Sequence, residues 1–234
     1  MASVAEHLVH QLEGAGVRHI YGIVGDSLNP VVDAVRRSKK IRWIHVRHEE
    51  TAAFAAAAEA EITGQLAVCA GSCGPGNLHL INGLYDANRS HLPVLAIASH
   101  IPTSQIGTGF FQETHPDRIF DECSVFSEMI SSSEQVPRVT RSAIQQALSN
   151  HGVAVLTLPG DIADMEVSGN LPDTITSPRP ARVVPNMEDV QGLADAINRA
   201  GKVTLFVGAG ARGAHDPIME LAELAKAPVG HSLR

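Results

Sequence analysis

Short apolar runs alternate with segments of helical periodicity along most of the chain, and this alternation limits the fold more than any other feature. The apolar runs are continuous, as in strands that are buried on both faces of a sheet. Strands that alternate with helices predict an α/β fold, with a parallel sheet flanked by helices on both faces. The predicted strands are residues 19–24, 41–46, 66–70, 93–98 and 153–158.

The predicted helices fill the intervals between these strands. The first covers residues 4–15, where apolar side chains recur at helical spacing, and Gly16 supplies its C-terminal stop. Asn29 and Pro30 predict an N-cap followed by proline at the first helical position. Further helices are predicted at residues 51–62, 78–87 and 134–149.

A polar stretch that is rich in proline divides the chain. It predicts a first domain at 1–164, a linker at 165–185 and the beginning of a second α/β domain at 186–234. The second part is too short to bury a core of its own, so we expect the chain to be truncated within that domain. Its predicted elements are helix 187–200, strand 203–207, helix 217–226 and a strand at 228–231.

Composition and charge limit the classes of partner. The chain is 44% hydrophobic and carries a formal net charge of -7, so nucleic acid and anionic membranes are poor partners. No apolar run approaches the roughly 20 residues of a spanning helix, and the N-terminus does not resemble a signal peptide. The 3 cysteines have no paired spacing, which predicts reduced thiols, a cytoplasmic protein and no metal site in this chain.

Ligands of parallel α/β sheets bind beyond the carboxyl ends of the strands. The chemistry is therefore expected in the loops that follow the predicted strands, at residues 25–26, 47–50, 71–77 and 99–115.

Glu49 is the sharpest candidate for a catalytic residue. It follows a strand and precedes an alanine-rich helix, so small apolar groups should surround its carboxyl group. A carboxyl group in such surroundings can share a proton with a ring nitrogen of a ligand. The alternative is that Glu49, like Glu50, is an acidic residue that interacts favourably with the helix dipole.

Two glycine-rich loops stand between a strand and a helix. The loop at 71–77, Gly-Ser-Cys-Gly-Pro-Gly-Asn, lets the backbone approach a ligand closely, but it equally suits a tight structural turn. The loop that contains Gly208, Gly210 and Gly213 has dinucleotide-binding spacing, which is a weak motif when it stands alone. A nucleotide site and a structural turn both remain open there.

The motifs taken together, in their order along the chain, resemble the thiamine-diphosphate-dependent enzymes. The segments are Tyr-Gly-Ile-Val-Gly-Asp-Ser at 21–27, Arg-His-Glu-Glu-Thr-Ala at 47–52, the region 66–87, Pro-Val-Leu-Ala-Ile-Ala-Ser-His at 93–100 and Phe-Phe-Gln-Glu-Thr-His-Pro at 110–116. The likeness is to the N-terminal pyrimidine-binding domain and extends over nearly the whole chain. Within the family, segments 72–80 and 110–116 look most similar to pyruvate oxidase and quinone-linked pyruvate dehydrogenase.

The resemblance implies specific roles for residues of this chain. Glu49 would hydrogen-bond N1′ of the cofactor's aminopyrimidine and so promote loss of the C2 proton, after which pyruvate is decarboxylated. Phe111 and Gln112 would face the reacting centre. Contacts around the pyrimidine would come from Val24, Gly25, Ser72 and Gly74, and Gly208 and Gly210 would begin an FAD-binding middle domain.

One departure from the family is large. The family holds the cofactor's diphosphate through Mg²⁺ and a Gly-Asp-Gly motif in a C-terminal domain, and this sequence contains no Gly-Asp-Gly. The family's active site forms between subunits, so a dimer or tetramer is expected, together with inactivity of this chain alone. The resemblance also implies a cytoplasmic protein that can be peripheral to the inner membrane in full-length members. An acetolactate synthase-like carboligase and a non-catalytic binding or dimerisation module remain as alternatives.

Overall fold

The computed structural model describes residues 2–167 and 183–232. Contacts divide the chain into two compact units, Met1–Pro180 and Ala181–Arg234. Most of the predicted linker, namely residues 168–182, lies outside the described residues.

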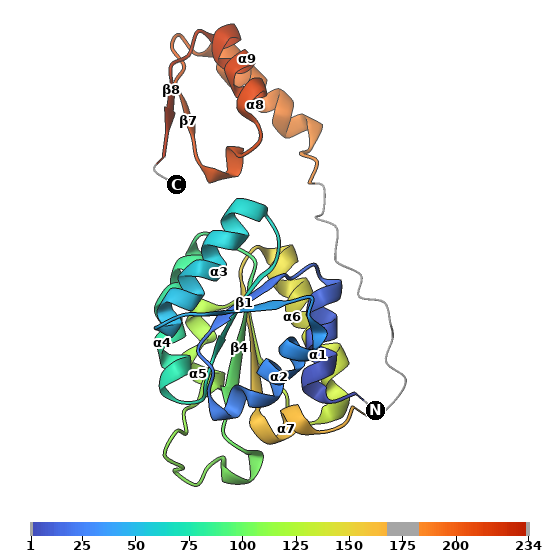
Figure 1. Cartoon of the computed structure of the whole chain (residues 1–234). Helices are drawn as coiled ribbons and strands as arrows, with labels where there is room; N and C mark the ends of the chain where they lie inside the picture. The colour runs from blue at the N-terminus through green and yellow to red at the C-terminus, as the bar shows by residue number, and fades with distance from the viewer. Residues whose placement is uncertain (1, 168–182, 233–234) are drawn as a thin grey trace. The chain divides into compact units, whose positions relative to one another are not determined.

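A single parallel sheet forms the centre of the first unit (Figure 1). All of its neighbouring strands pair in parallel, in the order β2-β1-β3-β4-β6-β5. This arrangement confirms the predicted α/β fold with a parallel sheet. The strands are β1 His19–Gly22, β2 Arg42–His45, β3 Ala67–Gly71, β4 Val94–His100, β5 Phe126–Met129 and β6 Val153–Pro159.

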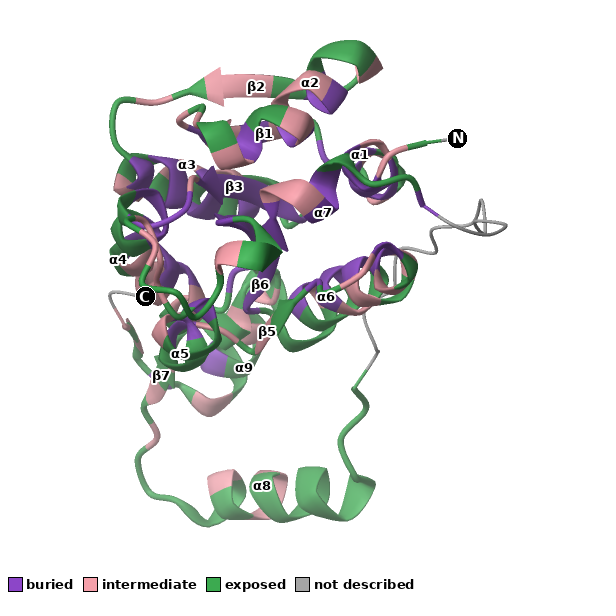
Figure 2. Ribbon diagram, turned by 90° about the horizontal axis from the view of Figure 1, so that it is seen from below, coloured by how far each residue is buried: buried purple, intermediate pink, exposed green. Residues whose placement is uncertain are grey.

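Helices cover both faces of the sheet, and the burial of β3 shows why its sequence is continuously apolar. Val68 and Ala70 belong to the core on one face, whereas Ala67 and Cys69 belong to the core on the other. Successive side chains of a strand point to opposite faces, so a strand covered on both sides must be apolar throughout. Figure 2 shows buried residues along β3 and on the inner sides of the helices.

Each face of the sheet has its own set of helices. The core residues on one face come from α1 Val4–Gly14, α2 Asn29–Ser38, α6 Val136–Asn150 and α7 Gly160–Asp164. The core on the other face comes from α3 Glu49–Thr63 and α4 Pro75–Arg89, with α5 Pro116–Ile119 packed beside them.

The predicted starts of three helices were wrong. The 3₁₀ turn Asp26–Leu28 precedes α2, so Asn29 is already helical and Leu28 takes the N-cap position without a side-chain hydrogen bond. Helix α3 begins at Glu49 rather than at residue 51, and α4 begins at Pro75 rather than at residue 78. Both shifts move residues of the candidate site from loops into the first turns of helices.

Residues 2–4 lie beside residues 165–167 in the first unit. The amide of Val4 donates to the carbonyl of Met165 at 2.8 Å, and the amide of Val167 donates to the carbonyl of Ala2 at 3.0 Å. Ser3 and Glu166 thereby form an isolated antiparallel bridge. The packed structure of the first unit therefore continues beyond residue 164, into the first residues of the predicted linker.

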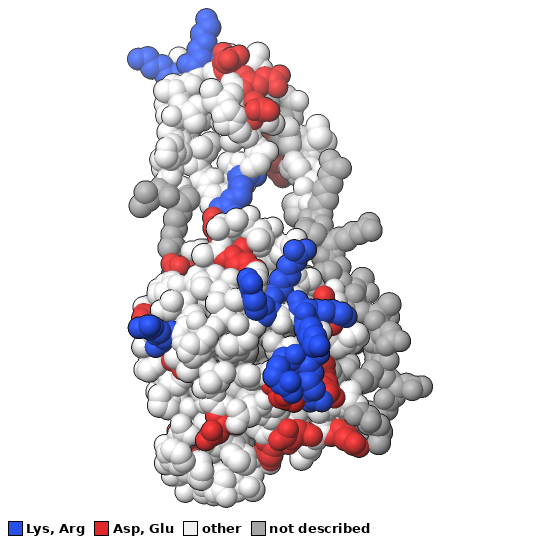
Figure 3. Space-filling view, viewed as in Figure 1, with Lys and Arg blue, Asp and Glu red and all other residues white. Residues whose placement is uncertain are grey.

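Charged side chains of both signs share the surface of the first unit (Figure 3). Arg37 on α2 pairs with Glu6 on α1 at 2.6 Å, and Lys40 pairs with Glu13 at 3.1 Å. Exposed pairs of this kind contribute little to stability. Their effect here is to neutralise the basic groups locally.

The second unit contains a two-stranded parallel sheet and two helices. The elements are α8 Met187–Arg199, β7 Leu205–Val207, α9 His215–Ala225 and β8 Val229–His231, in the predicted order. Large apolar side chains remain exposed, with Phe206 and Leu224 each at 77%. Among the described residues of the whole chain, no helix is both long and apolar enough to cross a membrane.

Two buried histidines predict that the first unit loses stability in acid. Burial lowers the pKa of His7, helped by neighbouring His10, and burial also lowers the pKa of His100. The unfolded chain therefore binds these protons more readily than the native chain does. The stability that these two neutral histidines contribute is fully present above about pH 6.5, the pKa of an unperturbed histidine, and is lost as the pH falls toward their lowered pKa values.

Thermal denaturation between pH 7 and pH 5 measures this effect, and His7→Gln supplies a variant that does not titrate there. We expect the midpoint of His7→Gln to depend less on pH than that of the wild type. Equal slopes for the two proteins would show that His7 does not contribute.

Candidate active site

Hydroxyl groups connect two of the loops that follow strands with the carboxyl end of a third strand. Ser27 Oγ lies 2.6 Å from Ser99 Oγ and 3.2 Å from Ser72 Oγ, and it accepts a hydrogen bond from the Cys73 amide at 3.1 Å. Ser27 and Ser72 follow β1 and β3, and Ser99 lies near the carboxyl end of β4; the three strands are neighbours in the parallel sheet. The carboxyl ends of the strands therefore form one continuous site, as such sheets favour.

The close approach of these loops requires glycine at position 25. A Cβ atom added to Gly25 would lie only 2.4 Å from Ser72 Oγ and 2.7 Å from Ser72 Cβ. Gly74 has a φ of +69°, in the left-handed region that favours glycine, and its nearest neighbour across the site is Gln112. The loop at 71–77 is thus a tight turn whose backbone lies against residues of two other loops.

The buried side-chain amide of Asn77 connects this turn to β4. Asn77 is fully buried, and its Nδ2 donates to the Ser99 carbonyl at 2.7 Å. Ser99 Oγ in turn donates to the Gly71 carbonyl at 3.1 Å. No local sequence pattern predicts the roles of Ser27, Asn77 and Ser99, because the partners in each of these hydrogen bonds are far apart along the chain.

Glu49 lies at the first turn of α3 and is 8% exposed. His48 caps the helix, with Nδ1 accepting from the Glu50 amide at 3.3 Å, so the side chain of Glu49 is left out of the cap. A Cβ atom on Gly76 would lie 3.2 Å from Glu49 Oε1, so a side chain at position 76 would crowd this carboxyl group. Within the described part of the chain, Oε1 has no hydrogen-bond partner.

His79 is a neighbour of Glu49 that sequence analysis missed. Its Nδ1 lies 3.2 Å from Glu49 Oε2, and its ring stacks on that of His48 with centroids 4.3 Å apart. His79 is placed here because it lies one helical turn beyond Pro75 on α4, which packs beside α3. The pair leaves one carboxylate oxygen of Glu49 engaged and the other available.

Phe111 and Gln112 lie on the long loop that follows β4. Gln112 Oε1 accepts a weak hydrogen bond from Cys73 Sγ at 3.5 Å, which connects this loop to the turn at 71–77. Phe111 is 81% exposed, and its ring lies beside that of Phe110, with centroids 5.0 Å apart. Phe111 thus presents a large apolar surface at the edge of the site.

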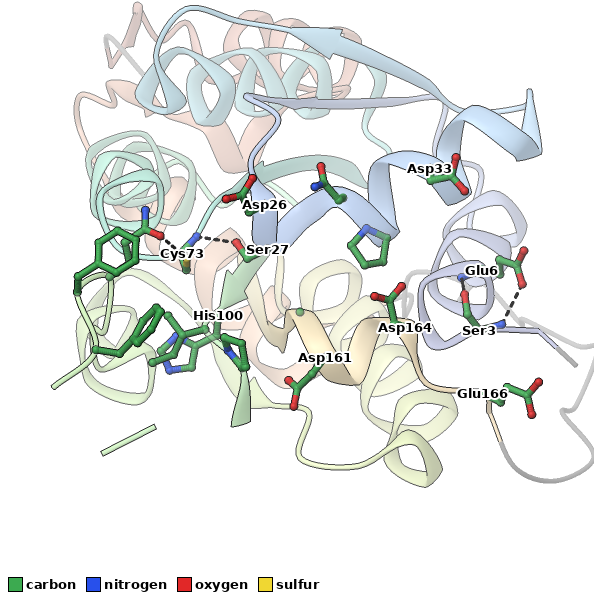
Figure 4. A pocket seen from close by; sticks show the side chains of 18 of the residues that line it. Ser3, Glu6, Asp26, Ser27, Asp33, Cys73, His100, Asp161, Asp164 and Glu166 are labelled. Atoms are coloured by element: carbon green, nitrogen blue, oxygen red, sulfur yellow. Dashed lines mark hydrogen bonds between the residues drawn. The ribbon is translucent and has the colours of Figure 1, made fainter. Parts of the chain in front are cut away.

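A cavity of about 900 Å³ adjoins this cluster (Figure 4). Cys73, His100 and Gln112 line it at one side, and Asp161 and Asp164 of α7 line it at the other. Glu49 is not among the described residues that line it. The cavity therefore lies beyond Cys73 and Gln112 rather than at Glu49, with the residues of the 71–77 turn between the two.

The predicted site residues fall into two groups in the structure. Gly25, Ser72 and Gly74 are brought together by the contacts described above, with Glu49 beside the same turn at Gly76 and Gln112 against Gly74. Val24 precedes Gly25 and is 49% exposed. Gly208 and Gly210 belong to the second unit, where they flank a 3₁₀ turn at 209–211.

No group of three or more His, Cys, Asp or Glu side chains is placed to bind a metal ion within residues 2–167 and 183–232.

Comparisons with known proteins identify the family. A family model described as "Thiamine pyrophosphate enzyme, N-terminal TPP binding domain" matches residues 2–119. The chain is 56% identical over 230 residues to an "Uncharacterized 42.6 kDa protein in isoamylase 3'region" of Pseudomonas amyloderamosa. The aligned region covers 98% of this chain and 58% of that protein.

Two relatives have named activities. The pyruvate oxidase of Lactiplantibacillus plantarum is 35% identical over 95% of this chain and 37% of its own length. An acetolactate synthase of Mycobacterium bovis is also 35% identical, over 96% of this chain and 37% of its own length. The chain thus spans between 37% and 58% of the length of these relatives. With its parallel sheet and the matched residues, the chain belongs to the thiamine pyrophosphate enzyme family, of which it carries the N-terminal domain.

Proposed function

We propose that this chain provides the pyrimidine-binding side of a thiamine-diphosphate enzyme that oxidatively decarboxylates pyruvate. The observation that carries the proposal is the position of Glu49: a nearly buried carboxylate with Oε1 left without a partner, beside the glycines of the 71–77 turn. Oε1 is not among the fully buried unpaired atoms of the described residues, so it stays accessible to a ligand. An accessible carboxylate oxygen on a nearly buried residue can accept a hydrogen bond from a ring nitrogen and exchange a proton with it.

The remaining residues fit the same ring. Gly74 and Gly76 let the backbone of the turn lie close to Gln112 and Glu49, and the Ser27, Ser72 and Ser99 hydroxyls hold the turn in place. When bound, thiamine diphosphate would supply the electron sink for decarboxylation. Glu49 would hold or release a proton at N1′, and Phe111 and Gln112 would shield the adjacent space from water and orient the keto acid.

Other parts of the proposal concern groups outside these residues. Mg²⁺ and the diphosphate would be held by a domain with the Gly-Asp-Gly motif, supplied by a longer polypeptide or a second chain. Flavin would bind near Gly208 and Gly210, where a strand leads into a glycine turn before α9. We further propose a homo-oligomer in the cytoplasm, and the 3 cysteines are free and buried, in keeping with that compartment.

Product analysis tests the reaction. The natural polypeptide, purified from its source cells, would be incubated with pyruvate, thiamine diphosphate and Mg²⁺, with and without the electron acceptor ferricyanide. We expect release of carbon dioxide that depends on ferricyanide, with two ferricyanide ions reduced for each carbon dioxide released. Acetolactate formed without an acceptor would instead identify a carboligase, for which the two named relatives give equal support. Failure to bind the cofactor or consume pyruvate would identify a non-catalytic module.

A further inference from the structure

The loop that carries Phe111 and Gln112 has little regular structure to hold it. Between β4 and α5 it contains only one short 3₁₀ turn, Thr103–Gln105, within the described residues. Phe111 is 81% exposed, so packing does not fix the position of its ring. The conformation of this loop must therefore come from hydrogen bonds within it and at its base.

The carboxylate of Glu113 makes the central hydrogen bonds. Its Oε1 accepts from the Gly107 amide, and its Oε2 accepts from the Gly109 amide at 2.8 Å. Backbone amides that converge on one carboxylate form an anion-binding nest, and hydrogen bonds to a charged acceptor are stronger than neutral ones. The amide of Gly107, followed by that of Gly109, lowers the pKa of Glu113, so its carboxylate form is the one that the loop stabilises.

The two glycines are required by the backbone rather than by lack of space. Gly107 has a φ of +84° and Gly109 a φ of +75°, and a Cβ atom at either position would meet nothing within 4 Å. Both residues occupy the left-handed region, which turns their amides toward Glu113. Residues 107–109 of the loop thus direct two backbone amides to the carboxylate of Glu113.

Glu113 also closes the turn that presents the two site residues. Its amide donates to the Phe110 carbonyl at 2.8 Å, which is the hydrogen bond of a β-turn. Phe111 and Gln112 occupy the two central positions of this turn. The same residue therefore holds the turn with its backbone and the preceding part of the loop with its side chain.

A second carboxylate fixes the base of the loop. Asp161 at the start of α7 accepts hydrogen bonds from the Thr103 amide, at 3.0 and 3.1 Å, and from the Thr103 hydroxyl. Gln112 touches Cys73 at the other end. With both ends attached, the conformation of the middle depends on Glu113.

From these contacts we propose that Glu113 is a positioning residue, whose carboxylate builds the loop that presents Phe111 and Gln112 to the site. The catalytic consequence rests on the proposed function, whereas the structural consequence does not. Glu113 itself acts through the loop rather than by contact with a substrate.

Amide hydrogen exchange, measured by NMR on this chain, tests the structural part. Glu113→Gln keeps the size of the side chain and removes its charge, and Glu128→Gln makes the same change at an exposed position on β5. We expect exchange at Gly107 and Gly109 to quicken by about tenfold or more in Glu113→Gln, as a charged acceptor is lost. Amides of β4 and β6 should keep wild-type rates in both variants, which verifies the fold.

Unchanged exchange at Gly107 and Gly109 in a folded Glu113→Gln would overturn the proposal. The same variant, tested in an assembly that holds the cofactor, should lower kcat while the rate of C2 proton exchange stays at the wild-type value. If the amides exchange faster but kcat is unchanged, the loop assignment stands and the role proposed for Phe111 and Gln112 is wrong. The two failures are therefore distinguishable.

Discussion

Replacing Glu49 with glutamine should slow exchange of the cofactor's C2 proton by about 10²–10⁴-fold, the range expected for loss of a general acid–base group. Glutamine has nearly the shape of glutamate, so the contact with His79 and the space beside Gly76 are retained. What is lost is the ability to take up and return a proton at Oε1. Hydrogen–deuterium exchange at C2, followed by NMR in an assembly that holds thiamine diphosphate, measures the rate.

Glu50 provides the matched control for this experiment. It is the next residue of α3, it is more exposed than Glu49, and its Oε1 accepts a hydrogen bond from Asn82 Nδ2. A glutamine oxygen can accept the same bond, so Glu50→Gln should leave C2 exchange near the wild-type rate. If Glu49→Gln and Glu50→Gln behave alike, Glu49 does not have the activating role, and its acidity serves only the helix N-terminus.

Replacing Gly83 with alanine should destabilise the first unit by about 1–2 kcal/mol. A Cβ atom on Gly83 would lie 2.5 Å from Ala53 Cβ and 3.0 Å from the Phe54 amide nitrogen, so α3 and α4 would have to separate. Overpacking of this kind costs about 1–3 kcal/mol, and the better helix propensity of alanine returns up to about 1 kcal/mol. Because α3 begins at Glu49, the shift should also disturb the candidate site.

Chemical denaturation measures the free energy of unfolding, and Gly192→Ala supplies the control. Gly192 lies within α8, where a Cβ atom would meet nothing within 4 Å. Alanine there gains helix propensity without any clash, so the second unit should be unchanged or stabilised by up to about 1 kcal/mol. A Gly83→Ala protein as stable as the wild type would show that α3 and α4 adjust without cost.

The sequence predicted the parallel sheet because β3, β4 and β6 are buried on both faces and therefore read as continuous apolar runs. It did not predict β5, whose residues Phe126–Met129 include serine and glutamate and lie at the sheet edge with partial exposure. The starts of α3 and α4 were missed because His48 is an unusual cap and Gly74 precedes its helix with a positive φ.

The candidate site was predicted in part for a related reason. Glu49, Phe111 and Gln112 are visible as members of sequence motifs, and position in a motif needs no knowledge of contacts. The network around Ser27 depends on pairs that lie 45 and 72 residues apart, which no local pattern connects. His79 was missed because its relation to Glu49 comes from the packing of α4 against α3. Glu113 was passed over because its role depends on the φ angles of two glycines.

The central claim is that Glu49 receives the aminopyrimidine of thiamine diphosphate, and a structure of the cofactor-loaded assembly tests it most directly. The natural polypeptide, or this chain joined to the diphosphate-binding domain of a relative, would supply the material. We predict a separation of about 2.6–3.2 Å between Glu49 Oε1 and N1′, the distance of a hydrogen bond. A pyrimidine bound elsewhere, with Glu49 turned away from the ring, would contradict the claim.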